Sequence, residues 1–474
     1  MGLELCGHFT YTQAIPNIYS PHPYCDDWRI LMYDLLIHGG DVLRIDGPTA
    51  HVLAGHDIAV QGGRIAAVAP AISPGLAREA IDAGGMLAIP GLVNAHTHAA
   101  MGLFRGVAED VPVEVWFNQR IWPMETNLTD EDIYWGTLLG IAEMIESGVT
   151  SFADHYFAMD EVARAVEESG ARALLAWAMF SGPDEDAQLQ RTLAFAKRWQ
   201  GAAGGRIRTC LGPHSPYTCT PAFLARAAAA ARESGLGVHL HLSETADQVA
   251  QSLAAYGKTP VAVAHDAGLF AVPALVAHMA HPTAEDIAIM AAHGVAVAAC
   301  PKTEMKLGAG VTPAGDLLAA EVTVGLGSDG AASNNSYDIL EAARLIALLE
   351  KHTRRNAAVM PVGATLGLAT AGGARCLGLG EAIGALRAGL HADIALLRMD
   401  APHLQPAHNL PAALLYSARS GDVDTVIVAG RVLMRGRRLL TIDRERVLRE
   451  VCARAGRLTE RRLGARMASY PEAG

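Results

Sequence analysis

Two histidines separated by one residue follow an apolar run and could hold a metal ion. Residues 86–93 are almost entirely apolar and lead into His96 and His98. On an extended strand, residues i and i+2 point to the same side, so the two imidazoles project together. They would supply half of the ligands of a tetrahedral site. A His-x-His pair is a weak signal in a chain with 19 histidines, so the interpretation depends on further ligands.

Further residues that suit such a site follow other apolar or β-rich segments. His239 and His241 share a face, and we expect His241 to be the ligand because it lies nearer the end of its segment. His239 is then structural. The remaining candidates are a carboxylate, a free acid and two more imidazoles: His214, Glu244, His278 and Asp329. No lysine ends the segment 207–215, where a carbamate would bridge two metals, so we expect a single ion.

The segments that carry these residues alternate with helical patterns. Thr220-Pro221 predicts a capped helix start, and Thr283 begins a capping-box pattern. Alternation of this kind over about 240 residues predicts an α/β fold, a (β/α)8 TIM-type barrel with its active site at the strand ends. A doubly wound open sheet is the alternative. The eight predicted strands are 90–98, 148–156, 171–180, 207–215, 237–244, 273–280, 295–302 and 322–330.

Both ends of the chain lack this alternation and instead contain short apolar strands joined by Gly-rich turns. Short strands joined by such turns are typical of β-hairpins and β-sandwiches. We therefore predict a small β-sandwich domain built from residues 31–89 and 385–440, with the barrel in 90–384 between its halves. Residues 1–30 are expected to form an irregular extension, and 441–474 a C-terminal helical tail.

Composition and charge narrow the class of function. The chain has 474 residues and a net charge of −11, without a basic block that could follow a phosphate backbone, so nucleic-acid binding is not expected. No window reaches the roughly 18 apolar residues of a membrane span. The seven cysteines are scattered, which is typical of reduced thiols. We expect a cytoplasmic enzyme.

As a set, the motifs resemble the amidohydrolase superfamily and, within it, the 5-methylthioadenosine/S-adenosylhomocysteine deaminase branch. The resemblance spans about 33–440 and rests on 90–98 with Met101, 122–125 (WPME), 212–217 (GPHSPY), 239–245 and 326–336 (LGSDGAASNNS). It implies the metal ligands His96, His98, His241 and Asp329. The reacting centre would contain Glu244 and His278, with Glu125 and His214 contacting the substrate. Zinc is the first expectation for the metal, with iron, nickel or manganese open, and relatives are commonly homo-oligomers.

These groups fit the hydrolytic deamination of a 6-aminopurine nucleoside. A divalent ion lowers the pKa of its water from about 15.7 toward about 7. Glu244 would move protons between this water and the ring nitrogen. Asp329 would bind the metal and accept a hydrogen bond from the attacking hydroxide, and His278 would stabilise the developing oxyanion.

Two departures from the branch bear on the substrate. Relatives often have an Arg where this chain has Trp177 or a neighbour, and Asn-Pro-x-Ser-Asn where it has the sequence Cys-Pro-Lys-Thr-Glu in 300–304. Both favour an uncharged 5′ substituent, as in 5′-methylthioadenosine or adenosine, with Trp177 as a substrate contact. Lys302 or Arg191 could instead supply the missing cation for S-adenosylhomocysteine.

Two other functions remain as alternatives. One is an aminohydrolase or chlorohydrolase of a triazine, or a guanine-type deaminase. Glu125 disfavours it, because a carboxylate there suits a ribose diol. The other is a binding barrel with a structural metal. The free Glu244 beside an open coordination position argues against it, since structural zinc sites are normally closed.

Overall fold

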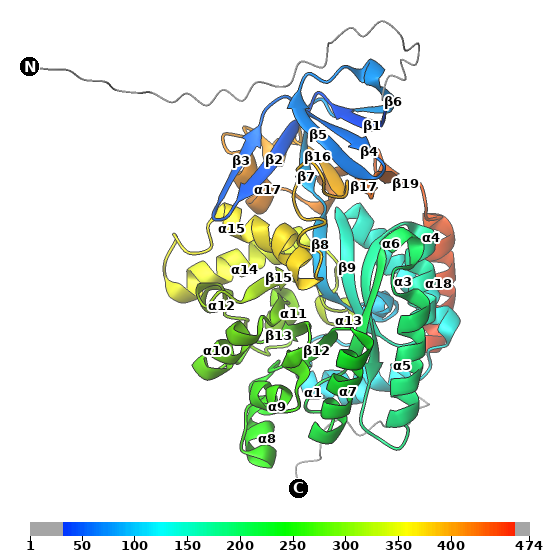
Figure 1. Cartoon of the computed structure of the whole chain (residues 1–474), viewed down its shortest axis with the longest axis vertical. Coiled ribbons are helices and arrows are strands. Elements are labelled where there is room, and N and C mark those ends of the chain that lie inside the picture. The colour runs from blue at the N-terminus through cyan, green and yellow to red at the C-terminus, as the bar shows by residue number, and fades with distance from the viewer. Residues whose placement is uncertain (1–31, 460–474) are drawn as a thin grey trace, which may run out of the picture.

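The computed structural model describes residues 32–459 (Figure 1). The predicted extension 1–30 and the end of the predicted tail lie outside the described residues. An eight-stranded parallel sheet forms the middle of the molecule, in sequence order. The backbone N–H of Asp329 donates to His96 O at 3.0 Å and so links the last strand region to the first. The strands are β8 (Leu92–Thr97), β9 (Val149–Tyr156), β10 (Arg172–Met179), β11 (Ile207–Pro213), β12 (Val238–Leu242), β13 (Ala274–His278), β14 (Ala296–Ala299) and β15 (Thr323–Leu326).

Helices follow the strands and cover the outside of the barrel (Figure 1). The predicted helix starts are confirmed, because the Thr220 hydroxyl accepts from Phe223 N and Thr283 forms a capping box with Asp286. Small side chains such as Ala95 and Ala153 fill the barrel interior, as its narrow cross-section requires. The main helices are α3 (Asp130–Glu146), α4 (Met159–Ser169), α5 (Glu185–Trp199), α7 (Pro221–Ser234), α8 (Ala246–Tyr256), α9 (Pro260–Asp266), α10 (Ala284–His293) and α14 (Ile339–Arg354).

Strands from both ends of the chain form two further sheets beside the barrel. One contains β1 (Tyr33–His38), β4 (His56–Gln61), β5 (Arg64–Pro70) and β6 (Ala77–Asp82). The other contains β2 (Asp41–Asp46), β3 (Thr49–Leu53), β7 (Met86–Pro90), β16 (Ile394–Arg398), β17 (Val423–Val428), β18 (Arg431–Arg435) and β19 (Arg438–Leu439). Apolar residues of both sheets share one core. The predicted fold class is confirmed, and the exact domain boundaries remain a prediction.

The observed barrel strands end earlier than predicted at the mouth of the barrel. β12 stops at Leu242, β14 at Ala299 and β15 at Leu326. Near these ends, Ser243 and Asp329 have φ of 46° and 61°. Non-glycine residues seldom adopt this left-handed region. The extended chain therefore breaks where the candidate site residues lie.

The C-terminal helix α18 (Arg444–Leu458) packs against α3. Its Arg457 forms an ion pair with the buried Asp132 at 2.6 Å, and Asp132 closes the capping box at the start of α3. α18 thus stabilises the start of α3, the helix between β8 and β9. Among residues 32–459, no helix has the length and apolarity needed to span a bilayer.

Candidate active site

A cavity, here called the central cavity, opens at the carboxyl ends of the barrel strands. Its polar wall contains most of the residues singled out from the sequence, and aromatic side chains form much of the remainder. Aromatic walls suit a planar ring, and the buried polar groups suit a reaction away from bulk water. The polar lining residues are His98, Glu125, His155, Tyr156, His214, Tyr217, His241, Glu244, His278 and Asp329.

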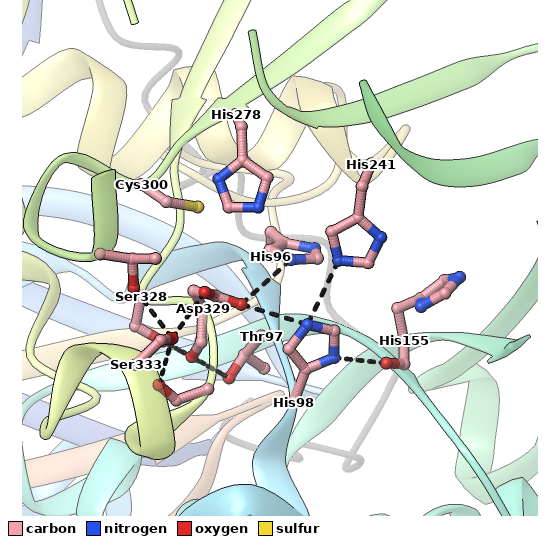
Figure 2. A network of polar contacts seen from close by, with 12 residues as sticks. His96, Thr97, His98, His155, His241, His278, Cys300, Ser328, Asp329 and Ser333 are labelled. Carbon is pink, nitrogen blue, oxygen red and sulfur yellow. Dashed lines mark hydrogen bonds and ion pairs between the residues drawn. The ribbon is translucent and has the colours of Figure 1, made fainter. Parts of the chain in front are cut away.

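The four predicted metal ligands converge at the base of this cavity (Figure 2). His98 Nε2 lies 3.3 Å from His241 Nε2 and 3.1 Å from Asp329 Oδ1. His96 Nε2 lies 3.5 Å from the same carboxylate oxygen. The donors come from the ends of β8 and β12 and from the turn after β15. Three imidazoles and one carboxylate are a ligand set that suits zinc and several other divalent metals.

The hydrogen bonds of these rings leave the facing nitrogens without protons. His98 Nδ1 donates to His155 O at 2.5 Å, and His241 Nδ1 donates to His214 O at 3.1 Å. A carbonyl only accepts, so a neutral ring held in this way carries its lone pair on Nε2. Two Nε2 lone pairs then face each other, while the buried His96 Nε2 makes no hydrogen bond within residues 32–459 and lies 3.5 Å from Asp329 Oδ1. A divalent cation satisfies all three nitrogens, so the residues fit a metal.

Burial and charge favour the ligand forms of His96, His241 and Asp329. Burial lowers the pKa of His98, but the neighbouring Asp329 and Asp154 carboxylates outweigh it and raise that pKa above its ordinary value. Burial lowers the pKa of His96 to about 4, and burial beside other imidazoles holds the pKa of His241 well below 6.5. Burial raises the pKa of Asp329, but the His96 and His98 rings beside its carboxylate outweigh it and keep that pKa well below its ordinary value. His239 Nε2 lies 2.9 Å from His96 Nδ1, where it can orient the His96 ring, as a structural role requires.

Glu244 and His278 adjoin the ligand cluster, and one ring nitrogen of His278 lies within 4.8 Å of ligand atoms of His96 and Asp329. His278 Nε2 lies 3.9 Å from Glu244 Oε1. The Tyr217 hydroxyl donates to Glu244 Oε2 at 3.1 Å, and Gln248 Nε2 donates to the same oxygen at 3.3 Å. Glu244 is therefore held at the cavity wall by its other oxygen. Its Oε1 lies on the side of His278.

The predicted substrate contacts Glu125 and His214 also line the central cavity. Tyr156 Oη donates to Glu125 Oε1 at 2.6 Å, and burial raises the pKa of Glu125 to about 7. His214 stacks on Phe180 with ring centroids 4.8 Å apart, and burial lowers its pKa to about 3. The cavity thus offers a neutral imidazole and a carboxyl group to a bound ring system.

The sequence interpretation missed three polar residues of this cavity: His155, Tyr156 and Tyr217. The first two end β9, where Asp154-His155-Tyr156 closes an apolar strand. A polar cluster at a strand end is the available signal, the same one that marks His214 and His241 on their strands. Tyr217 ends the GPHSPY motif of residues 212–217, but its hydrogen bond to Glu244 depends on the folded chain.

Trp177 lies outside the central cavity, although it was predicted to contact the substrate. It lines a neighbouring cavity, here called the side cavity, together with Arg191. Lys302 lines neither cavity. It donates to Glu341 at 2.7 Å and to Ser336 at 3.1 Å. Of the two cations considered from the sequence, only Arg191 is placed near a ligand space.

Comparisons with known proteins agree with this architecture. Residues 87–433 match the Amidohydrolase family. A 5-methylthioadenosine/S-adenosylhomocysteine deaminase of Desulforudis audaxviator is 52% identical over 409 residues, covering 85% of this chain and 95% of that protein. One of Pelotomaculum thermopropionicum is 45% identical, covering 91% of this chain and 100% of that protein.

Solved structures of related proteins have the same overall fold. An adenosine deaminase from Xanthomonas campestris with bound zinc superposes with a TM-score of 0.86 at 35% identity, covering 90% of this chain and 98% of that one. An atrazine chlorohydrolase from Arthrobacter aurescens TC1, complexed with zinc, gives a TM-score of 0.82 at 27% identity, covering 90% and 100%. With the match over 87–433, the chain belongs to the amidohydrolase family and is a hydrolase of amidine substrates.

Proposed function

We propose that this protein is a metal-dependent deaminase of 6-aminopurine nucleosides, with 5′-methylthioadenosine or adenosine as its substrate. S-adenosylhomocysteine remains open as a further substrate. One observation carries the proposal: the cluster of histidines and Asp329 lies in the same cavity as Glu244 and Glu125. Relatives at 43–52% identity named as deaminases of such nucleosides support it.

His96, His98, His241 and Asp329 would hold a single divalent ion. When bound, that ion supplies a water acidified toward a pKa of about 7 as the nucleophile. Zinc is the favoured metal because the solved adenosine deaminase and chlorohydrolase relatives carry it, while the ligand set also suits iron, nickel or manganese.

The protein side chains would orient the purine and move its protons. Glu244 takes a proton from the attacking water and delivers it to N1 of the ring, as its position at the cavity wall permits. His278 donates a hydrogen bond to the oxygen that adds to C6, and Asp329 accepts one from it. The remaining proton of the added hydroxyl then passes by way of Asp329 to the amino group, which leaves as ammonia and yields the 6-oxo nucleoside.

The ribose would bind beside Glu125. Its carboxylate accepts from the 2′ and 3′ hydroxyls, while Tyr156 donates to one of its oxygens at 2.6 Å. His214 and Phe180 would contact the base or sugar from the adjoining wall. A bare triazine or guanine ring has no diol for Glu125 to bind, so this residue favours nucleosides over those substrates.

A screen of ammonia release tests the proposal. The metal-loaded protein is incubated with adenosine, 5′-methylthioadenosine, S-adenosylhomocysteine, guanine and triazines. We expect rapid release from at least one of the first two nucleosides. Turnover of guanine or a triazine alone would overturn the nucleoside proposal while leaving the hydrolase family unchanged.

A further inference from the structure

A buried carboxylate lies behind the reacting centre, on the side of His278 away from Glu244. It belongs to Glu304, on α11 (Pro301–Lys306), in the segment 300–304 that departs from the motif of the deaminase branch. Glu304 is 0% exposed and lines neither cavity. Among residues 32–459, the only basic side chain within ion-pair distance of it is that of His278. A buried carboxylate without a strong cationic partner is costly unless hydrogen bonds compensate it.

Three hydrogen bonds from the surrounding chain end on this carboxylate. Glu304 Oε1 accepts from Cys300 N at 2.9 Å and from the Thr312 hydroxyl at 2.8 Å. Its Oε2 accepts from Thr312 N at 2.9 Å. An amide has a single accepting oxygen and would turn its NH2 group toward one of these donors. The donors therefore suit a carboxylate, which fixes Thr312 through both its backbone and its hydroxyl.

Thr312 in turn holds the backbone of His278. Its buried hydroxyl lies 2.5 Å from His278 O, so its proton is shared between this carbonyl and Glu304. His278 ends β13 with a φ of 73°, in the left-handed region that strains a non-glycine residue. Such a conformation persists only where the surrounding structure restrains it. The Thr312 hydroxyl is one of these restraints.

The same carboxylate also faces the His278 ring. Glu304 Oε1 lies 3.8 Å from His278 Nδ1, while His278 Nε2 lies 3.9 Å from Glu244 Oε1. The ring thus lies between two carboxylates, with one nitrogen toward each. Its Nε2 is on the side of Glu244, from which it can donate a hydrogen bond to an oxygen that adds to C6.

We propose that Glu304 and Thr312 are positioning residues that fix the orientation of His278 for the chemical step. This inference rests on the proposed function, in which His278 donates to the oxygen added at C6. Glu304 holds Thr312, and Thr312 holds the strained His278 backbone, so the ring presents Nε2 to the reacting centre in one orientation. Neither Glu304 nor Thr312 lines the central cavity. Their effect should therefore appear in kcat, and only through His278.

The test uses the zinc-loaded full chain and the nucleoside that it deaminates fastest. Thr312→Val removes the hydroxyl at nearly constant shape, and Thr312→Ser keeps it. Glu304→Gln is a second disruptive variant, and Thr312→Val alone decides if Glu304→Gln does not fold. The matched control is Thr365→Val, because this buried hydroxyl also donates to a backbone carbonyl, Met360 O at 3.1 Å, and lines neither cavity. Thr312→Val is also made in a His278→Ala protein, and metal content and thermal melting are measured for all variants.

We expect Thr312→Val and Glu304→Gln to lower kcat by about 10–100-fold, because a misplacement of about 1 Å can cost about 10²-fold. KM should change less than about twofold, since an interaction made only in the transition state does not alter substrate binding. Thr312→Ser and Thr365→Val should stay within about threefold of the unmodified protein, with metal content constant throughout. In His278→Ala, adding Thr312→Val should cost less than about twofold, because residues that act through one ring are not additive.

Two results would overturn this inference while deamination stands. One is an unchanged kcat in folded Thr312→Val. The other is an undiminished loss from Thr312→Val in the His278→Ala protein, which would show a general structural role. If the unmodified protein deaminates no nucleoside, the proposed function fails and this inference fails with it.

Discussion

The central and side cavities share lining residues, Glu125 among them, but are built from different parts of the fold. In the central cavity, His96 and His241 are buried on barrel strands, and backbone or side-chain hydrogen bonds fix their rings. In the side cavity, Arg191 is an exposed residue on a helix and is held by one aromatic contact. Rigid strands suit groups that must meet within a few tenths of an ångström, while helices and loops tolerate change. Substitutions in the central cavity should therefore have larger effects than substitutions in the side cavity.

The largest effect is expected at the metal site. His241→Ala removes one of three imidazole ligands, so we predict loss of most of the bound metal and of activity toward every substrate in step. His293→Ala, at an exposed position on α10, is the matched control and should keep both. Elemental analysis and ammonia release measure the two quantities. Full metal occupancy in His241→Ala would contradict the ligand assignment.

Glu244→Gln should keep the metal but lower kcat by about 10²–10⁴-fold, the contribution of a positioned proton carrier. The amide has nearly the same shape and can still accept from Tyr217, but it cannot carry the proton. Metal content measured alongside turnover separates this result from loss of the ion. Near-normal turnover would make Glu244 only a neighbour of the site.

Glu125 lies at the junction of the two cavities and should have an intermediate effect. Glu125→Ala should lower kcat/KM for ribonucleosides by roughly 10–200-fold, because hydrogen bonds to a buried charge contribute about 1.5–3 kcal/mol. A 2′,3′-dideoxy analogue should show a comparable loss with the unmodified protein and little further loss with the variant. Independent, additive losses would show that Glu125 does not bind the diol.

The smallest effect concerns pH. Burial raises the pKa of Glu125 to about 7, so its carboxyl group is protonated below that pH and ionised above it. The preference for a ribonucleoside over its dideoxy analogue should therefore rise by about tenfold between pH 6 and pH 8, following the ionised fraction. Taking the ratio of the two substrates cancels titration elsewhere in the site, and Glu125→Gln should flatten it. A flat ratio in the unmodified protein would place the diol elsewhere.

The barrel and most of the central cavity could be predicted from sequence because each depends on local patterns. Residues such as His96 and His98 lie at the end of an apolar strand. The starts of α7 and α10 can be predicted because Thr220 and Thr283 are typical N-cap residues. The strand ends were less predictable. The extended backbone breaks at Ser243, where the left-handed conformation depends on the surrounding fold.

The location of Trp177 shows why the substrate contacts were harder to predict. Ala176 packs with the barrel interior, so its neighbour on β10 points the other way. Trp177 accordingly meets Phe195 of α5, with ring centroids 5.6 Å apart. The alternation of side chains along β10 can be predicted from the sequence. Which face of the strand points into the barrel depends on how the sheet closes. The adjacency of Arg191 depends on helix packing and has no comparable local signal.

In the proposed function, one metal ion at the barrel mouth drives the deamination. The most direct measurement is a titration of the chelator-treated protein with zinc, following ammonia release from the best nucleoside of the screen. We predict no activity before metal is added, a linear rise, and a plateau at one equivalent per chain. Full activity in the metal-free protein, or a plateau at two equivalents, would contradict it.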